Sequence, residues 1–111
     1  MPRIVLASAS VSRRRLLESA GLKPTIMVSH VDEETDFFNA MTPADMVIAL
    51  AITKAHTIRE QIDFPAIIIG CDSTFEFDSQ SLGKPATPEI AIERASRVRG
   101  NTGLLHTGHC I

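Results

Sequence analysis

Three short runs rich in β-branched residues, separated by helical patterns, most constrain how this chain of 111 residues can fold. The runs cover residues 3–7, 25–29 and 66–70, and turn-forming residues bound them, as is typical of buried strands. Helical patterns occupy residues 12–20 and 42–60 between the runs. The order strand, helix, strand, helix, strand predicts an α/β fold in which helices flank a twisted mixed sheet.

Helix start signals support this order. Thr42 is a good N-cap residue, and Pro43 suits the first helical position, where the missing N–H costs nothing. Thr87 and Pro88 repeat the signal, and we expect this third helix to end near Arg99, before a glycine.

The second half of the chain predicts a hairpin and a last strand. Residues 75–77 alternate in polarity, residues 78–81 are turn formers, and Leu82 is expected to begin the return strand. Residues 104–111 form a weaker last strand, and the chain stops there. Because an unpaired strand edge attracts a partner, we expect missing sequence beyond residue 111 and a homodimer.

The length, net charge and composition of the chain predict one domain and exclude two classes of partner. A chain of this length predicts a single domain over residues 1–111. Its net charge of −2 gives no overall basic field, so we expect no nucleic-acid partner, and a phosphate site would have to be local. Apolar runs are too short for a membrane span, so no membrane partner is expected.

The cysteines and histidines point to a reducing compartment and to no structural metal. Cys71 and Cys110 are far apart in sequence and lie in apolar stretches, which favours buried thiols over a disulfide. The histidines show no zinc-ligand spacing with them. We therefore expect a cytoplasmic protein.

Polar side chains follow each of the three predicted strands. They are Ser8-Ala9-Ser10, the segment 30–34, and Asp72-Ser73-Thr74. In open α/β sheets, ligands bind at the carboxyl ends of the strands, so these groups mark one candidate crevice. The alternative is that strand ends are polar simply because loops meet water.

Arg13 shares a helical stripe with Leu16, Leu17 and Ala20, which we expect to be buried, so its side chain should turn toward the protein. A cation in the first turn of a helix opposes the helix dipole, and a bound phosphate would resolve that conflict. Alternatively, the guanidinium reaches out to water while its aliphatic part packs.

Lys54 is the one charged residue on a stripe with Val47, Ala51 and Ile58. A lysine on a buried stripe needs a negative partner, which is either a carboxylate of the protein or an anionic ligand.

Asp72 is the strongest single candidate for chemistry. It follows an apolar run, where an unpaired carboxylate would be costly. Glu33 could supply a second oxygen ligand for Mg²⁺, which binds phosphate substrates through one or two carboxylates. Two carboxylates with Arg13 and Lys54 suit metal-assisted attack of water on a phosphoryl group.

Five motifs in one order together resemble the Maf (septum formation protein) family of nucleotide pyrophosphatases. They are Leu6-Ala7-Ser8-Ala9-Ser10 with Arg13, Asp32-Glu33, Lys54-Ala55, Gly70-Cys71-Asp72-Ser73, and Leu82-Gly83-Lys84-Pro85, followed by a Thr107-Gly108 segment. The resemblance implies a Maf/ITPase-like fold, a second lobe absent here, and a Mg²⁺ or Mn²⁺ cofactor. It also implies that the substrate is a nucleoside triphosphate.

The resemblance assigns a role to each matching residue. It implies that Asp72 is the general base and that Asp72 and Glu33 hold the metal. It further implies that phosphates are bound by Ser8, Ser10, Arg13, Lys54 and Lys84. We expect these groups to line one concavity, with Asp72 and Arg13 on the same side of the sheet.

Three departures from the family pattern concern this site. Residues 10–13 read Ser-Val-Ser-Arg where the family often has Ser-Pro-Arg-Arg, which implies weaker phosphate affinity. Ser73 stands where threonine is usual, and Gly103 where histidine is common.

The function expected is hydrolysis of nucleoside triphosphates, including noncanonical and pyrimidine nucleotides, to monophosphate and pyrophosphate. A non-catalytic protein that senses nucleotides or regulates cell division is the main alternative, and an inert α/β fragment is the third. A paired general base and metal carboxylate favour the enzyme, because a binding module needs neither.

Overall fold

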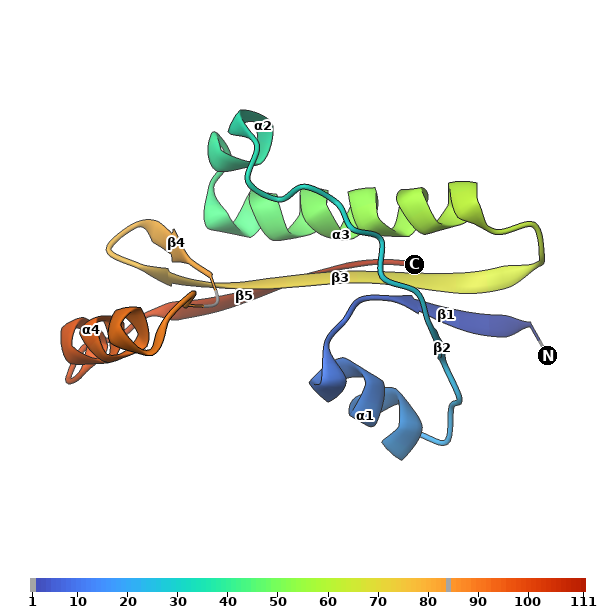
Figure 1. Cartoon of the computed structure of the whole chain (residues 1–111), viewed down its shortest axis with the longest axis horizontal. Helices are drawn as coiled ribbons and strands as arrows, with labels where there is room; N and C mark the ends of the chain where they lie inside the picture. The colour runs from blue at the N-terminus through green and yellow to red at the C-terminus, as the bar shows by residue number, and fades with distance from the viewer. Residues whose placement is uncertain (1, 84) are drawn as a thin grey trace.

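The computed structural model describes residues 2–83 and 85–111, which form nine helices and strands. The strands are β1 (Arg3–Ala7), β2 (Thr25–Ile26), β3 (Ala66–Phe77), β4 (Gln80–Leu82) and β5 (Leu104–Cys110); the helices are α1 (Val11–Ser19), α2 (Asp36–Asn39), α3 (Pro43–Gln61) and α4 (Pro88–Val98). All the strands in the described part of the chain belong to one mixed sheet, with α1 and α3 on its opposite faces (Figure 1). The predicted α/β class with a mixed sheet is confirmed.

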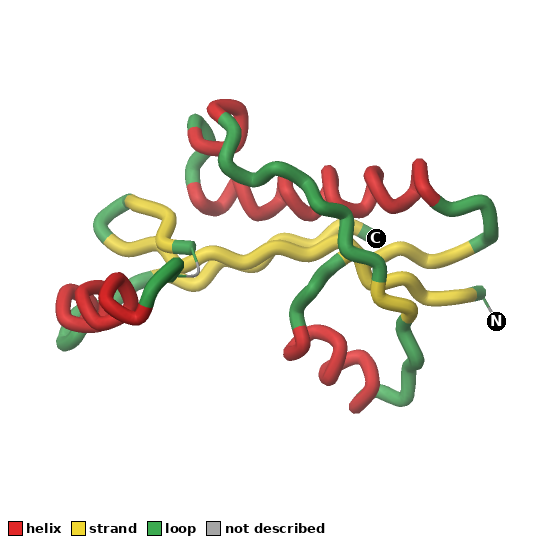
Figure 2. The backbone as a smooth tube through the Cα atoms, viewed as in Figure 1, coloured by secondary structure: helices red, strands yellow, loops and turns green. Residues whose placement is uncertain are grey.

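Strand β3 runs along most of the sheet, and its neighbours change along its length (Figure 2). Gly70 pairs with both β1 and β5, and Glu76 pairs with both β4 and β5. Strands β1 and β4 therefore share one edge of β3, while β5 occupies the other. On the β1 side, residues 71–74 have no strand partner among the described residues, which leaves a gap between the end of β1 and the hairpin.

Helix α3 packs closely on β3 and builds the core. Val47, Ala51 and Ile58 are buried, as their shared stripe predicts. A Cβ atom at Gly70 would overlap the carbonyl oxygen of Ala51, so glycine allows the helix to approach this closely. Both helix starts predicted from Thr-Pro pairs are confirmed, because Thr42 and Thr87 accept hydrogen bonds from backbone N–H groups in the first turns of α3 and α4.

The prediction that a strand ends at residue 70 is wrong. Strand β3 continues to Phe77 because β5 supplies antiparallel hydrogen bonds from Gly70 to Glu76. Asp72-Ser73-Thr74 therefore lies within a strand rather than in a loop after it. The segment still borders an opening, because β1 ends opposite Gly70.

Three other boundaries differ from those predicted. Strand β2 ends at Ile26 because it pairs with β1 through only two residue pairs. The hairpin turn is shorter, because Asp78 and Ser79 both adopt positive φ angles of 51° and 60°, typical of a two-residue turn, so the return strand starts at Gln80. Helix α2 was missed, although Thr35 caps it through its hydroxyl.

Helix α1 is more exposed than its sequence stripe predicts. Leu16 is 70% exposed, and within α1, all of which is described, no side chain is buried. The expectation of buried leucines is wrong because the two-residue β2 offers this helix little sheet surface. No helix in residues 2–83 and 85–111 is both long and apolar enough to cross a membrane.

The two cysteines carry free thiols. Cys71 is buried and Cys110 is partly buried, in agreement with the prediction of thiols rather than a disulfide. Burial raises the pKa of the Cys71 thiol, so it is protonated at neutral pH.

Candidate active site

A cavity of about 870 Å³ lies at the gap between the end of β1 and the β3–β4 hairpin. The loop before α1 and its first turn, the segment around Glu33, α2 and α3, β3 and the hairpin all contribute residues to its lining. The lining residues are Ser8, Ala9, Ser10, Arg13, Glu33, Glu34, Asn39, Met41, Pro43, Met46, Leu50, Lys54, Asp72, Ser73, Thr74, Ser79, Gln80, Ser81 and Gly83. The predicted convergence is confirmed for Ser8, Arg13, Glu33, Lys54 and Asp72; Lys84 lies outside the described residues.

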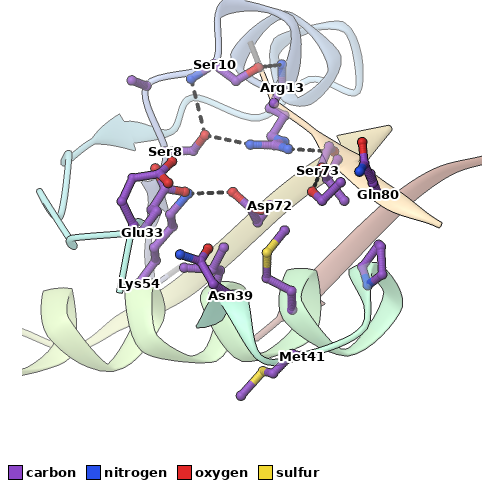
Figure 3. Close-up of a pocket in the computed structure, with 18 of the residues that line it drawn as sticks. Ser8, Ser10, Arg13, Glu33, Asn39, Met41, Lys54, Asp72, Ser73 and Gln80 are labelled. Atoms are coloured by element: carbon purple, nitrogen blue, oxygen red, sulfur yellow. Dashed lines mark hydrogen bonds and ion pairs between the residues drawn. The ribbon is translucent and has the colours of Figure 1, made fainter. Parts of the chain in front are cut away.

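Two hydroxyl groups hold the guanidinium of Arg13 (Figure 3). Its Nη1 donates to Ser8 Oγ at 3.0 Å, and its Nη2 donates to Ser73 Oγ at 2.8 Å. Ser8 Oγ also accepts from the backbone N–H of Ser10 at 3.2 Å. Arg13 therefore faces the cavity, and neutral hydroxyls orient it; no carboxylate in residues 2–83 and 85–111 forms an ion pair with it, so its positive charge is uncompensated there.

The N-terminus of α1 adds to this positive region. Ser10 caps the helix, because its hydroxyl accepts from the backbone N–H of Arg13 at 3.3 Å. The first turn contains no acidic residue, so the partial positive charge of the helix end is not neutralised within it. A free helix N-terminus next to a guanidinium is a favourable place for an anion.

Lys54 contacts both acidic side chains of the site. Its Nζ lies 2.8 Å from Asp72 Oδ1 and 3.1 Å from Glu33 Oε1. The side chains of Lys54 and Asp72 are 15% and 12% exposed, whereas that of Glu33 is 46% exposed. Lys54 thus has the carboxylate partner that the sequence left open as one of two possibilities. It also lines the cavity, so it can meet a ligand at the same time.

The pKa values in this group reflect burial first. Burial raises the pKa of Asp72, the nearby Glu33 carboxylate raises it further, and the ammonium of Lys54 opposes both without cancelling them. Burial lowers the pKa of Lys54, but its hydrogen bonds and charge interactions with Asp72 and Glu33 outweigh burial and raise it. Lys54 is therefore a cation at neutral pH, and Asp72 accepts a proton more readily than an exposed aspartate.

Arg13 and Lys54 reach the cavity from opposite sides of the sheet, so the expectation that Arg13 and Asp72 share one side is wrong. Successive residues of a strand point to opposite faces. Asp72 meets Lys54 on the α3 side, and Ser73 meets Arg13 on the α1 side. The groups still line one cavity because β3 has no strand neighbour beside residues 71–74 in the described part of the chain, so the opening spans the edge of the strand.

The residues present fit a divalent cation on a phosphate substrate. Asp72 and Glu33 converge on one point, where Lys54 Nζ lies. Among the described residues, no group of three or more His, Cys, Asp or Glu side chains could hold a metal ion. Two carboxylates are the number that Mg²⁺ commonly takes from a protein when substrate oxygens and water complete its coordination.

Sequence reasoning missed two parts of the cavity. Ser73 was noted as a hydroxyl after a strand, but its contact with Arg13 was not predicted. Asn39, Met41 and Met46 were also missed as cavity residues; Asn39 belongs to the unpredicted helix α2, Met41 follows it, and Met46 lies in the first turns of α3. The signal that could have revealed α2 is Thr35 followed by Asp36, a capping residue and an acidic first turn.

Comparisons with known proteins identify the family of this chain. The family model described as Maf-like protein matches residues 3–111. A nucleoside triphosphate pyrophosphatase of Streptomyces coelicolor is 47% identical over 110 residues, which is 98% of this chain and 52% of the relative. Proteins of the same name from Prochlorococcus marinus and Thermosynechococcus vestitus are 47% and 46% identical; they align with 97% and 96% of this chain and 57% and 53% of their own lengths.

The chain spans about half the length of the curated relatives it matches. The match to the family model nevertheless covers nearly the whole chain, including each described residue of the cavity. By this match, the chain belongs to the Maf-like protein family.

Proposed function

We propose that this protein hydrolyses nucleoside triphosphates, including deoxynucleotides and noncanonical or pyrimidine nucleotides, to nucleoside monophosphate and pyrophosphate. The observation that carries the proposal is the union, in one cavity, of an uncompensated guanidinium and a Lys54–Asp72–Glu33 group. The names of the relatives support the same reaction class.

The phosphate chain would lie at the α1 end of the cavity. Arg13 uses two of its donors on Ser8 and Ser73, and a guanidinium has five, so donors remain for phosphate oxygens. Ser8 and Ser10 would contribute through the loop that they hold in place before α1. Lys54 would supply a second positive charge from the α3 side.

Asp72 would act as the general base. It would accept a proton from a water molecule while the water oxygen bonds to phosphorus and pyrophosphate leaves. A base works best when its pKa lies near the working pH, and burial moves the pKa of Asp72 in that direction. Lys54 holds the carboxylate in place at 2.8 Å.

Glu33 and Asp72 would hold the divalent cation, Mg²⁺ or Mn²⁺. Such an ion, when bound, neutralises phosphate charge and polarises the phosphoryl group for attack. Glu33 is the more exposed of the two acids, so it is free to turn from Lys54 toward a cation that arrives with the nucleotide.

The nucleoside would lie against the uncharged part of the cavity lining. The described residues there carry no charge: Asn39, Met41 and Met46 lie on the helical side, and Ser79 and Gln80 lie on the hairpin. Apolar thioethers beside amide and hydroxyl groups suit a base and a sugar, which need packing and a few hydrogen bonds.

A protein that binds nucleotides without hydrolysing them remains the second candidate. The observation that favours it is the direct contact of Lys54 with both acids, because a lysine that stays there would compete with a metal ion. The two candidates predict the same binding but different turnover.

Pyrophosphate release from a panel of nucleoside triphosphates with Mg²⁺ or Mn²⁺ tests the proposal. The panel should be run on this chain and on the Streptomyces coelicolor relative as a positive control. We expect release that depends on the metal. Nucleotide binding without pyrophosphate release would favour the sensing function. The absence of both binding and release would refute both functions.

A further inference from the structure

Thr107, which lies outside the cavity, is connected to the guanidinium of Arg13 through the hydroxyl of Ser73. Thr107 lies on β5, directly opposite Ser73 on β3. Its Oγ1 lies 2.9 Å from Ser73 Oγ, and Ser73 Oγ in turn accepts from Arg13 Nη2 at 2.8 Å. Thr107 does not belong to the cavity lining, since β5 is on the edge of β3 away from the gap.

We propose that Thr107 is a positioning residue, which orients Arg13 toward the phosphate end of the cavity through the hydroxyl of Ser73. The inference rests on the proposed function for the role of Arg13 in binding phosphate. The orienting contact itself is a property of the protein without a ligand.

The hydroxyl of Ser73 can hold Arg13 only if it is itself held. A serine side chain rotates among three staggered positions, and a single hydrogen bond to a long arginine does not select one of them strongly. Thr107 supplies a second contact to the same oxygen. Because ordering an arginine side chain costs conformational entropy, a guanidinium that is fixed before binding loses less on contact with phosphate.

Thr107 is well suited to serve as the fixed end of this chain of contacts. Threonine is branched at Cβ, so its own rotation is restricted. The next residue, Gly108, lies so close to α3 that a Cβ atom there would meet the Val47 carbonyl at 2.5 Å. This packing fixes β5 relative to the helix, and the antiparallel register then fixes Thr107 relative to Ser73.

The contact with Ser8 cannot replace this arrangement. Ser8 holds Nη1, and Ser73 holds Nη2. With Ser8 alone, the guanidinium could still turn about that one hydrogen bond. Two anchors, Ser8 in the loop after β1 and Ser73 on β3, define the plane of the group, and that plane decides which of its donors point into the cavity.

The first test measures Arg13 without any ligand. Rotation of its guanidinium about the Cζ–Nε bond is followed by NMR in the wild type, Thr107→Val, Thr107→Ser and Ser73→Ala. We expect slow rotation in the wild type and Thr107→Ser, and faster rotation in Thr107→Val and Ser73→Ala. Thr102→Val, at an exposed position before β5, is the control and should match the wild type. Unchanged rotation in both Thr107→Val and Ser73→Ala would overturn the inference.

The second test measures the affinity for inorganic pyrophosphate by calorimetry. Thr107→Val should weaken binding about threefold to tenfold, the usual effect of one neutral hydrogen bond, and Thr107→Ser should restore it. In an Arg13→Ala background, Thr107→Val should have no further effect, whereas an undiminished effect would show that Thr107 does not act through Arg13. A wild type that binds no phosphate compound would refute the proposed function, while the NMR result would still decide whether Thr107 orients Arg13.

Discussion

The Nζ atom of Lys54 lies 2.8 Å from Asp72 Oδ1, and both side chains are largely shielded from water. This pair joins the middle of α3 to the middle of β3, so the core helix positions the candidate base. Glu33 shares the same ammonium at 3.1 Å. The pKa of Asp72 therefore depends on how strongly the ammonium of Lys54 interacts with Asp72 rather than with Glu33.

Replacing Lys54 with methionine should raise the pKa of Asp72 above its value in the wild type. Burial already raises this pKa, and Lys54 is the group that opposes burial. The side-chain carboxyl ¹³C shift of Asp72, followed against pH, measures the change. The exposed Lys23→Met serves as a control with no expected effect. An Asp72 pKa that stays the same or falls in Lys54→Met would contradict this account.

The same shift sets the sign of a pH effect on stability. The folded pKa of Asp72 lies above the ordinary value of 3.8, so between these values the folded state binds more protons than the unfolded state. The stability contributed by Asp72 is therefore present below pH 3.8 and is lost as the pH rises through the folded pKa. Urea unfolding should show the wild type losing stability relative to Asp72→Asn across this window.

Asp72→Asn should abolish most turnover but leave binding nearly intact. The amide keeps the shape of the side chain but cannot accept the proton of water, and loss of a positioned base typically lowers a rate about a hundredfold to ten-thousandfold. Pyrophosphate release and calorimetric nucleotide affinity, both at saturating metal, distinguish the two effects. Wild-type turnover in Asp72→Asn would show that another group is the base.

Arg13→Ala should weaken pyrophosphate binding by roughly tenfold to a hundredfold, the usual range for a hydrogen bond to a charged group. Arg14→Ala is a matched control on the same helix, because Arg14 pairs with the exposed Glu18 rather than facing the cavity. Calorimetry with inorganic pyrophosphate compares the two. Equal losses of pyrophosphate affinity in the two variants would mean that the net charge of the protein, rather than a contact of Arg13, determines binding.

Gly70→Ala should destabilise the fold by about 1–3 kcal/mol, the usual cost of forcing extra atoms into a packed core. The added methyl would press on the backbone of α3 at Ala51 and move the helix that carries Lys54. Gly83→Ala is the control, since a Cβ atom there meets nothing within 4 Å. Denaturant unfolding would contradict the prediction if the two variants had the same midpoint.

Association through β5 remains a prediction. Leu104 and Leu105 are 57% and 73% exposed, and a strand edge with exposed leucines attracts a second copy. We expect a dimer in sedimentation experiments, and Leu105→Lys should weaken it because charge disfavours edge pairing. A monodisperse monomer at high concentration would count against it.

Local signals in the sequence predicted the three longer helices, α1, α3 and α4, but not the four-residue α2. Thr42 with Pro43, and Thr87 with Pro88, mark helix starts through contacts within one turn, so distant residues do not alter them. Arg13 lines the cavity, although the stripe of buried leucines from which its inward direction was predicted is wrong, because Leu16 is 70% exposed. Its position in the first turn of α1, where a cation opposes the helix dipole, was the separate signal that favoured an anion beside it.

Features that depend on distant partners could not be predicted. Strand β3 extends past Gly70 because β5, more than thirty residues later, pairs with it. The contact between Ser73 and Thr107 requires the register of those two strands, which no local pattern encodes. The exposure of Leu16 depends on the two-residue length of β2, which pairs with β1 only at Val5 and Leu6.

Because α1 is exposed, we expect it to open more readily than the rest of the protein. None of its described side chains is buried, and the two hydrogen bonds of Arg13, to Ser8 and to Ser73, tie it to the end of β1 and to β3. Segments with few buried contacts open at low free energy, and their amide protons exchange early. A ligand that binds Arg13 would therefore protect the whole of α1 from exchange, so the helix would report occupancy of the cavity at a distance from it.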